Sequence, residues 1–385
     1  MNVLFLSPAF PPHHHLFCAA LRRRGVTVLG VGDTPHHELP PGLAAALTEY
    51  VWLPSLEDHE TLHRAVAGLI HRHGRIDRLD SLIEHWLGHE GQLRDDFNVP
   101  GLRADATARM RRKSGMAELY AAAGVPQPPG RRVEVPGDVR DFARTHGLPL
   151  VVKPDTSAGA VGAFRVDDEE RLRDLPELLP GRYVQPFVTG DIVTFDGLTD
   201  RDGAIVFSTS HTYDAGIMEV VGERRDGHYY SQRVIPADLD DLGRRAVAAF
   251  DLRERFFHAE FFRRPDGSLL ALEMNLRPPG GFTVDMMNYA CDLDLYDLWA
   301  AVLTGAPTAG RFGGERPFHS AHAGRRDGRS YRLSHDALLA TLGDTLVLWR
   351  RLPAEFAAMQ GNVMYLLRHP DLATLREAIA LVQAV

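Results

Sequence analysis

Residues 258–281, HAEFFRRPDGSLLALEMNLRPPGG, contain two glutamates that a β-hairpin would bring face to face. An Asp-Gly pair stands between two apolar runs, which is a strong signal for such a hairpin. A turn centred on that pair places Glu260 opposite Glu273, where the two carboxylates repel each other. A divalent cation relieves the repulsion, and oxygen ligands from Glu260, Glu273 and Asn275 suit a hard ion such as Mg²⁺. The spacing therefore predicts a magnesium site on the hairpin.

The same register extends the charged face beyond the two glutamates. It places His258 opposite Asn275, and strand alternation puts Arg277 on the face of Asn275. The planar guanidinium of Arg277 matches a phosphate or a carboxylate. One alternative is a surface hairpin whose charged face is only solvated, although the neighbouring phenylalanines and leucines indicate half-burial. A second alternative is a slipped register, because Pro265 lacks an N–H and favours a longer loop.

A lysine and a small-residue loop form the second candidate site. Lys153 ends an apolar strand, and the loop that follows it contains Ser157, Gly159 and Gly162, whose backbone N–H groups could approach phosphate oxygens. No helix and no Gly-Lys-Ser/Thr sequence follow, so this is not a Walker A loop. Lys113, in a helical segment upstream, is a further cation that could reach phosphates. The alternatives are an ordinary glycine-containing hairpin and a solvated basic helix face.

A hinge-like segment follows the strand at 182–185. Since Pro186 has no N–H, the Gln185 carbonyl and the Phe187 N–H are the predicted pair for adenine, with Val188 beside them. Asp191 could accept ribose hydroxyls. The alternative is a plain strand with a polar end.

Composition excludes several classes of protein. The chain has 385 residues, a net charge of −8 and a pI near 6.2, so it lacks the basic surface expected for binding nucleic acid or an anionic membrane. Two cysteines, Cys18 and Cys291, cannot form a disulfide framework and favour a reduced, cytoplasmic setting. The first residues read as a strand and not as a signal peptide, and no apolar run is long enough to span a bilayer.

The N-terminal third alternates strands and helices. Strands at 3–6 and 26–31 flank a helix at 16–24, which predicts a parallel sheet, and a second helix is expected at 62–73. A strand ending at 82–83 places Glu84 and His85 at the carboxyl edge of that sheet, where ligands bind in open α/β folds. No dinucleotide fingerprint follows the first strand.

The rest of the chain is richer in strands. Asp105 is the expected cap of a helix that runs to 123, and Asp196-Gly197 and Asp202-Gly203 are further hairpin signals. A single helix is expected over 285–303, followed by a linker at 307–317. In the tail we expect strands at 345–348 and 363–367 and helices at 335–341 and 371–382.

In this order, the residues resemble the ATP-grasp superfamily. The matching set is Lys113, Lys153 with its glycine loop, the 185–188 hinge, and Glu260 followed by the Glu273-Met-Asn275-Leu-Arg277 run. The resemblance covers about residues 1–305 and implies an α/β fold. It implies an N-terminal parallel α/β pre-ATP-grasp domain (1–104), two ATP-grasp lobes (105–306, divided into 105–182 and 183–306) and a small C-terminal accessory α/β region (307–385).

The resemblance also implies cofactors and roles. ATP would lie between the lobes with two Mg²⁺ ions, Mn²⁺ being a substitute. Lys113 and Lys153 would bind ATP, the set Glu260, Glu273 and Asn275 would hold metal, and Arg277 would face the transferring phosphoryl group. Two departures affect the nucleotide contacts: Gln185 stands where many members have an acid, and Ile192 where a ribose-binding glutamate is common.

The layout most resembles carboxylate–amine ligases related to biotin carboxylase and carbamoyl-phosphate synthase. Such an enzyme would phosphorylate a carboxylate to an acyl phosphate and couple it to an amine, and an amine like that of an amino acid is the expected one. Two alternatives are a bicarbonate-activating carboxylase, which the absence of a biotinyl-carrier signature disfavours, and an ATP-binding regulator without turnover.

The substrates are not specified by these motifs. The partners expected are a small carboxylate and a small amine, and a homodimer is compatible with the tail, which would otherwise complete the active site. Three consecutive histidines at 13–15 cannot all reach one ion on regular backbone, so a zinc site is disfavoured and a loop lining the substrate cleft is the other interpretation. The candidate substrate residues are Glu84, His85, His211, Tyr213, Asp214 and Arg233.

Overall fold

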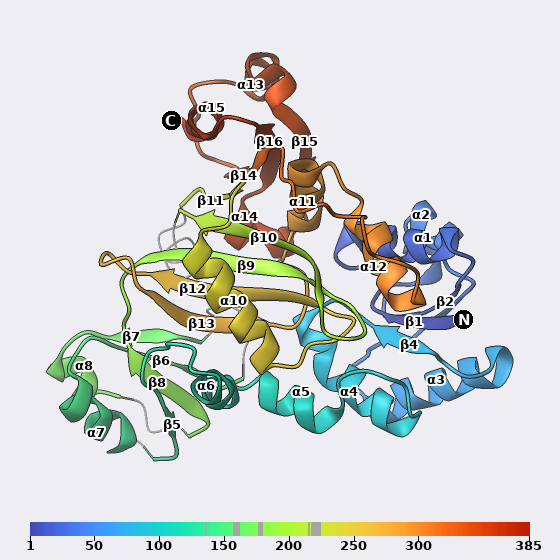
Figure 1. The fold of residues 1–385 in the computed structure, drawn as a ribbon, viewed down its shortest axis with the longest axis horizontal. Helices are drawn as coiled ribbons and strands as arrows, with labels where there is room; N and C mark the ends of the chain where they lie inside the picture. The colour runs from blue at the N-terminus through green and yellow to red at the C-terminus, as the bar shows by residue number, and fades with distance from the viewer. Residues whose placement is uncertain (136, 157–161, 176–179, 215, 217–224) are drawn as a thin grey trace.

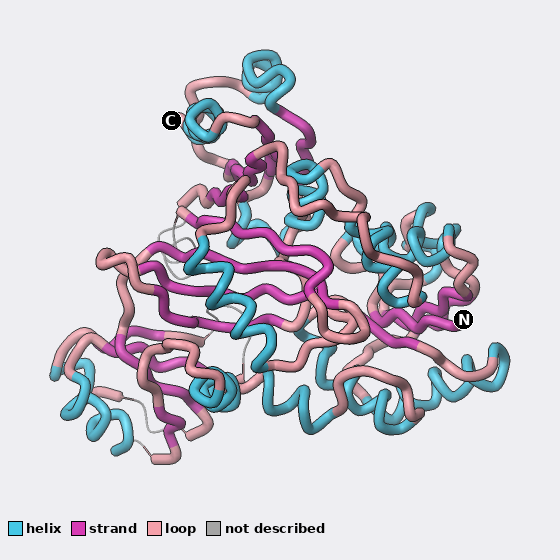
Figure 2. Tube along the Cα trace, viewed as in Figure 1, coloured by secondary structure: helices cyan, strands magenta, loops and turns pink. Residues whose placement is uncertain are grey.

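The computed structural model describes residues 1–135, 137–156, 162–175, 180–214, 216 and 225–385. Within them the strands form three sheets, of four, eight and four strands. Figure 1 shows the N-terminal domain beside one end of the large central sheet, with the small lobe at the opposite end. Figure 2 colours the same view by secondary structure and shows helices packed against the sheets. Among the described residues, no helix has both the length and the apolar composition needed to cross a bilayer.

The N-terminal sheet is parallel, as predicted. Its order is β3-β2-β1-β4, and its strands are β1 (Asn2–Leu6), β2 (Thr27–Gly32), β3 (Glu49–Trp52) and β4 (Arg78–Asp80). The helices of this domain are α1 (His15–Arg23), α2 (Pro41–Ala46), α3 (His59–His73) and α4 (Leu87–Asp96). Phe17 of α1 packs edge-on against Trp299, so the domain shares a core with a helix of the large lobe.

The strand predicted to end at 82–83 ends earlier. β4 stops at Asp80, and Leu82 has a left-handed φ of 58°, a conformation that cannot continue a strand. Residues Glu84–Trp86 form a short 3-10 helix, η3, instead of following a strand end directly. Glu84 nevertheless lies at the carboxyl edge of the sheet, because the turn after Asp80 carries it there.

The single helix predicted over 105–123 is two helices, α5 (Ala104–Met110) and α6 (Lys113–Ala122). Arg112 between them has an extended ψ of 132°, and Asp155 of the small lobe supplies the start of the second helix. Its carboxylate accepts from Ser114 N and Ser114 Oγ, each at 2.8 Å, while its carbonyl accepts from Lys113 N at 2.8 Å. A tertiary contact therefore decides the break, and Asp105 is not a cap.

The small lobe contains a four-stranded antiparallel sheet in the order β5-β8-β6-β7. Its strands are β5 (Arg131–Val133), β6 (Leu150–Pro154), β7 (Phe164–Val166) and β8 (Arg182–Pro186), with α7 (Gly137–His146) and α8 (Glu169–Arg173) against them. Since β8 belongs to this sheet, we propose the boundary between the lobes after Pro186 and not at 182.

The eight-stranded sheet has the order β13-β12-β9-β10-β11-β14-β16-β15. Its strands are β9 (Asp191–Thr199), β10 (Ile205–Tyr213), β11 (His228–Ser231), β12 (Phe256–Arg263), β13 (Leu269–Asn275), β14 (His319–Arg325), β15 (Leu346–Arg351) and β16 (Val363–His369). The C-terminal strands therefore extend the large lobe's own sheet. The hairpin predicted at Asp202-Gly203 is confirmed, whereas Asp196-Gly197 lies inside β9 and makes no turn.

Helices cover both faces of this sheet. On one face α10 (Ala237–Ala249) packs against the odd-numbered apolar residues of β12, so the even-numbered residues, His258 and Glu260 among them, face the other side. The helix predicted over 285–303 is two helices, α11 (Thr283–Cys291) and α12 (Leu295–Thr304), because Asp292 has a left-handed φ of 47°. The tail contains α13 (His335–Leu342), α14 (Ala354–Gln360) and α15 (Leu372–Gln383), and its predicted strands and helices are confirmed.

The hairpin of β12 and β13 has the predicted pairing. Glu260 lies opposite Glu273, and His258 opposite Asn275. The turn is centred on Asp266 and not on the bond between Asp266 and Gly267. This difference by itself would shift the register of the two strands. A β-bulge next to Glu260 absorbs the extra residue, so the predicted pairs survive.

Candidate functional site

The two hairpin carboxylates, Glu260 and Glu273, lie together on the sheet face opposite α10. Neighbouring groups stabilise their negative charges unequally. Glu260 Oε1 accepts hydrogen bonds from Asn275 Nδ2 at 3.2 Å and from His258 Nε2 at 3.1 Å. Burial opposes the ionisation of Glu260, yet the hydrogen bond from His258 brings its pKa below the ordinary value. Burial raises the pKa of Glu273, and Glu260 adds to that shift. Glu273 is therefore the less compensated charge of the pair.

Two lysines from different elements face Glu273. Lys153 ends β6, Lys113 begins α6, and they are only 8% and 5% exposed. Burial lowers the pKa of Lys153 from 10.5 to about 8, and Lys113 adds to the shift while Glu273 opposes it. Both ammonium groups lie close enough to Glu273 to lower its pKa against the effect of burial. The structure thus brings four of the predicted residues, Lys113, Lys153, Glu260 and Glu273, to one place.

The donor set fits a hard cation that also binds phosphate. Among the described residues, no three His, Cys, Asp or Glu side chains are arranged to hold a metal by themselves. Glu260, Glu273 and Asn275 could supply oxygen ligands, and the rest of an octahedral shell would come from phosphate and water, as is usual for Mg²⁺. Since Asn275 directs its Nδ2 at Glu260, its Oδ1 is the atom that could face an ion.

Arg277 lies where the hairpin meets the N-terminal domain. Its Nε is 3.9 Å from Glu84 Oε2, and its Nη1 donates to the Pro278 carbonyl at 2.7 Å. Glu84 also lies 3.6 Å from Arg111 Nε, and its Oε2 is buried without a hydrogen bond in the described part of the chain. A guanidinium and a carboxylate thus stand side by side with unused hydrogen-bonding capacity.

The sequence analysis missed a buried hydrogen-bonded group behind Glu260, which consists of Asp196, His258 and His211. Asp196 is 0% exposed and accepts from His258 Nδ1 at 2.5 Å and from His211 Nδ1 at 2.6 Å. His258 lies between the carboxylates of Asp196 and Glu260, at 2.5 and 3.1 Å, and their negative charges raise its pKa to about 9 against the effect of burial. His258, two residues before Glu260, was a usable signal, whereas Asp196 was hidden in a false turn motif.

The predicted substrate residues divide into two groups. His211 is hydrogen-bonded to Asp196. Tyr213 stacks on Tyr229, with ring centroids 4.7 Å apart, on the sheet face that carries Glu260. In contrast, His85 pairs with Glu57 on the exposed surface at 2.6 Å.

Two further substrate candidates are held in local contacts. Arg233 is exposed and donates to the carbonyls of Arg316 and Pro370, each at 3.0 Å. Asp214 lies 3.5 Å from His228 Nδ1 at the end of β10.

Two of the three histidines at 13–15 are buried. His13 and His14 are 5% and 3% exposed, and burial lowers the pKa of both, which keeps them neutral. His13 packs against Phe282, and His14 lies near enough to Arg277 to be affected by its charge. Two of the three histidines therefore line the junction of the N-terminal domain with the loop after Arg277.

The predicted adenine pair at the hinge is wrong. Phe187 N–H donates to the Pro149 carbonyl at 3.0 Å, and Gln185 is paired with Val151 inside the small sheet. Both groups therefore face β6 and are already used. Because backbone groups alternate sides along a strand, the Pro186 carbonyl and the Val188 N–H face the opposite edge.

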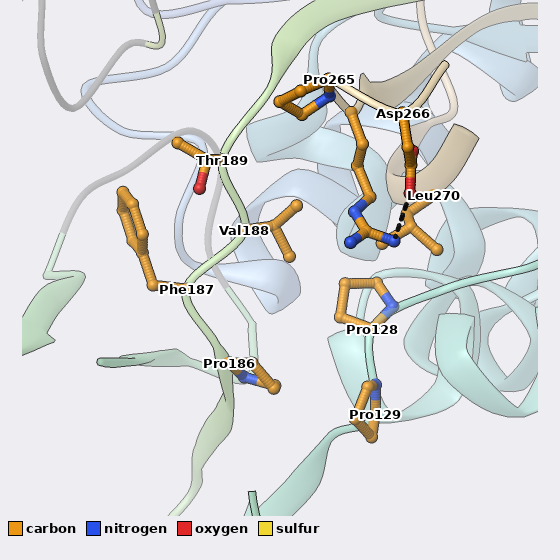
Figure 3. A pocket seen from close by; sticks show the side chains of 10 residues that line it. Pro128, Pro129, Pro186, Phe187, Val188, Thr189, Pro265, Asp266 and Leu270 are labelled. Atoms are coloured by element: carbon orange, nitrogen blue, oxygen red, sulfur yellow. Dashed lines mark ion pairs between the residues drawn. The ribbon is translucent and has the colours of Figure 1, made fainter. Parts of the chain in front are cut away.

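A cavity of ≈ 480 Å³ borders that free edge. Figure 3 shows the side chain of Val188 directed toward Leu270 and Pro128, with Phe187 on the other side of the hinge strand. The wall is mostly apolar, as a purine base requires, and the only charged residues on it, Arg264 and Asp266, form an ion pair at 3.4 Å. It is lined by Pro128, Pro129, Pro186, Phe187, Val188, Thr189, Arg264, Pro265, Asp266 and Leu270.

Other nucleotide contacts are only partly described. Ser157 and Gly159 of the small-residue loop, and Met218 near the predicted substrate segment, lie outside the described residues. Gly162 has a φ of 72°, and its carbonyl accepts from Arg182 Nη1 at 2.6 Å. Asp191 is exposed at the start of β9.

Comparison with known proteins finds relatives at low sequence identity. No family model matches the chain. The L-arginine-specific L-amino acid ligase of Bacillus subtilis is 22% identical over 235 residues, covering 58% of this chain and 57% of that protein. The D-alanine–D-alanine ligase of Azoarcus sp. (strain BH72) is 26% identical over 226 residues, covering 54% and 71%. The chain thus spans little more than half the length of the Bacillus relative.

A solved structure covers nearly the whole chain. The L-amino acid ligase from Bacillus licheniformis superimposes with a TM-score of 0.78 at 16% identity, covering 99% of this chain and 96% of that one. At this identity the superposition shows that the two proteins share an overall fold, which is the kind of fold that the resemblance seen in the sequence implies.

Proposed function

We propose that the protein is an ATP-dependent carboxylate–amine ligase acting on an amino acid. The observation that carries this proposal is the meeting of Lys113, Lys153, Glu260, Glu273 and Arg277 from both lobes around one undercompensated carboxylate. Such a site can neutralise the triphosphate and the charge that develops during phosphoryl transfer. The relatives that are named amino-acid ligases support the same reaction class.

The proposed chemistry has two steps. An oxygen of the substrate carboxylate attacks the γ-phosphorus of ATP, ADP leaves, and an acyl phosphate forms. The nitrogen of an amine then attacks the acyl carbon, phosphate leaves, and the nitrogen loses a proton as the amide forms. Lys113 and Lys153 bind phosphate oxygens, and Arg277 faces the oxygen that becomes negative in both steps. Bound Mg²⁺, held by Glu260, Glu273 and Asn275, would supply further charge neutralisation.

The neighbouring charges of Glu84 and Arg277 suggest the substrate class. A guanidinium and a carboxylate 3.9 Å apart match the carboxylate and the ammonium of one amino acid. The adenine would lie in the cavity beside the free edge of Pro186 and Val188. A cytoplasmic location and a homodimer belong to the same proposal, and light scattering of the purified protein tests the second.

The test is Mg²⁺-dependent ADP release from ATP with each standard L-amino acid and a set of small carboxylic acids. Hydroxylamine is present, because it traps an acyl phosphate as a hydroxamate. A hydroxamate that forms with one amino acid supports the proposal and identifies half of the substrate pair. ADP release with bicarbonate alone would instead indicate a carboxylase. ATP binding without release of ADP across the whole panel would favour an ATP-binding regulator.

A variant sharpens the test. Arg277→Ala should abolish hydroxamate formation while ATP binding, measured by calorimetry, stays within about threefold, since Arg277 faces the reacting groups and not the base. Arg264→Ala, at the wall of the adenine cavity, is the matched control and should change ATP affinity more than the reaction with the acid. Full turnover in Arg277→Ala would overturn the assigned role.

A further inference from the structure

Four charged side chains are buried together where the N-terminal domain meets the large lobe. Asp80, Glu90, Arg94 and Arg255 are each no more than 3% exposed. Glu90 Oε2 accepts from Arg94 Nη2 at 2.9 Å and from Arg255 Nη2 at 3.0 Å, and Arg255 Nη2 lies 3.6 Å from Asp80 Oδ1. The two carboxylates and the two guanidinium groups balance in charge. The four residues come from three separate parts of the chain: β4, α4 and the segment that leads into β12. We call this group the interface cluster.

One side of the interface cluster holds the turn that carries Glu84. Asp80 Oδ1 accepts from the N–H groups of Ser81 at 2.9 Å and Leu82 at 3.1 Å. Glu90 Oε1 accepts from Ser81 N at 2.8 Å and also from Ser81 Oγ. Leu82 has a φ of 58°, which a β-carbon-bearing residue adopts only when its surroundings require it. The two carboxylates therefore hold a strained turn in place.

The other side of the interface cluster holds the strand end that carries Arg277. Arg255 Nη1 donates to the carbonyl of Leu276 at 2.9 Å. Leu276 lies between Asn275, the predicted metal ligand, and Arg277, the predicted transfer arginine. The hydrogen bond from Arg255 therefore fixes the backbone between these two residues. The guanidinium of Arg255 thus contacts both Glu90 of the N-terminal domain and the strand end that carries Arg277.

Stability alone is a poor explanation for this arrangement. Desolvating four charges costs free energy that their mutual attraction rarely exceeds, and apolar residues of similar volume often serve a core as well or better. What apolar residues cannot do is hold two named backbone groups at fixed positions across a domain boundary. The directed hydrogen bonds of the interface cluster do this for Ser81 and for Leu276.

We propose that Arg255 is a positioning residue that sets Glu84 of the N-terminal domain against Arg277 of the hairpin, and so fixes the geometry of the substrate end of the site. Arg255 touches neither substrate nor nucleotide in this assignment. It acts through Leu276 on one side and through Asp80 and Glu90 on the other. Its kinetic consequence rests on the proposed ligase function, whereas its structural consequence does not.

The neighbouring residue offers a matched control. Glu254 forms a two-pronged ion pair with Arg78 of β4, with distances of 2.7 and 3.0 Å, and this pair also joins the N-terminal domain to the large lobe. It lies nearer the surface, with side chains 15% and 12% exposed, and makes no bond to Ser81 or Leu276. Arg78→Met therefore weakens the same domain contact and leaves the positioning bonds intact.

The first experiment is hydrogen–deuterium exchange of the full chain as wild type, Arg255→Lys, Arg255→Met and Arg78→Met. Lysine keeps the charge but cannot donate to Leu276 and to Glu90 together, since it lacks the planar fork. We expect faster exchange in both Arg255 variants for peptides covering residues 81–86 and 274–281, with no change in β1 or β10. Arg78→Met should leave both peptides unchanged. Equal effects of all three substitutions, or none at these peptides, would overturn the positioning role.

The second experiment is steady-state kinetics with the amino acid that the hydroxamate panel identifies. Arg255→Lys should lower kcat/KM for that amino acid by about 10- to 100-fold, as expected for a displacement of reacting groups by about 1 Å. The KM for ATP should stay within about twofold. A parallel loss for ATP and amino acid would show a merely structural role. If no amino acid is activated by wild type, the ligase proposal fails, and the exchange comparison still decides whether Arg255 positions the turn.

Discussion

The hairpin site and the interface cluster treat buried charge in opposite ways. In the interface cluster each carboxylate has a guanidinium within 3.6 Å, and the acidic and basic groups are equal in number. On the hairpin, the partly buried Glu273 lies opposite another carboxylate, and burial raises its pKa despite two lysines nearby. The interface cluster is balanced in charge by itself, whereas under the proposed function a cation and phosphates would complete the charges of the hairpin.

This difference helps to separate function from support. A balanced set of mutually paired charges requires no ion from solution and can hold other groups in place. An undercompensated carboxylate stores unfavourable free energy that a ligand can release, and perturbed pKa values of this kind are common at functional sites. Burial likewise lowers the pKa of Lys153, the lysine that we propose binds phosphate.

The largest expected effect is that of Glu273→Gln. Turnover should fall by at least about 10³-fold, because a metal ligand contributes several kcal/mol of charge stabilisation in the transition state. The free energy of unfolding without ligand should stay the same or rise, since the substitution removes a buried charge that is only partly compensated. ADP release and urea unfolding measure the two quantities, with Glu118→Gln on the exposed side of α6 as control. Turnover close to wild type would remove Glu273 from the metal set.

The interface cluster should respond in the opposite way. Arg94→Met leaves Glu90 with one guanidinium fewer and should destabilise the protein by about 3–5 kcal/mol, the usual result of removing one partner from a buried ion pair. Urea unfolding followed by circular dichroism measures this loss. Adding Glu90→Gln should recover part of it, because the uncompensated charge disappears while Ser81 keeps an acceptor. A double variant less stable than the sum of the two single changes would contradict this reading of the interface cluster.

The smallest effect is a pH dependence at Lys153. Burial lowers the folded-state pKa of Lys153 from 10.5 to about 8, so the folded protein binds this proton less tightly than the unfolded chain does. Its contribution to stability is therefore present above pH 10.5 and is lost as the pH falls toward 8. We expect Lys153→Met to be more stable than wild type at neutral pH by up to about 3 kcal/mol, and the difference to shrink as the pH rises. Urea unfolding of both proteins across this range checks the sign, and a difference independent of pH would contradict it.

Much of the architecture followed from local patterns in the sequence. The apolar runs and glycine stops at the N-terminus predicted the parallel sheet, and the Asp-Gly pair predicted the hairpin with Glu260 opposite Glu273. These succeed because strand pairing across a short turn depends on residues close together in the chain. The pairing survived an error in the turn centre only because the bulge next to Glu260 absorbed the extra residue.

The failures have a common cause in contacts between distant segments. The helix break before Lys113 depends on Asp155, and the availability of the Phe187 N–H depends on Pro149 of another strand. Asp196 was taken for a turn residue, because its pairing with His258 and His211 exists only once β9 lies between β12 and β10.

By itself, then, the sequence determined which residue types share a strand face and which carboxylates oppose each other. It also contained the set of lysines, acids and arginine from which the ATP-grasp resemblance follows. Only the tertiary structure decided which charges are compensated. Arg255 reads as an ordinary strand-end arginine until the N-terminal domain brings Asp80 and Glu90 to it. The physical reason is that desolvation and Coulomb interaction depend on distance in space, which local sequence patterns do not contain.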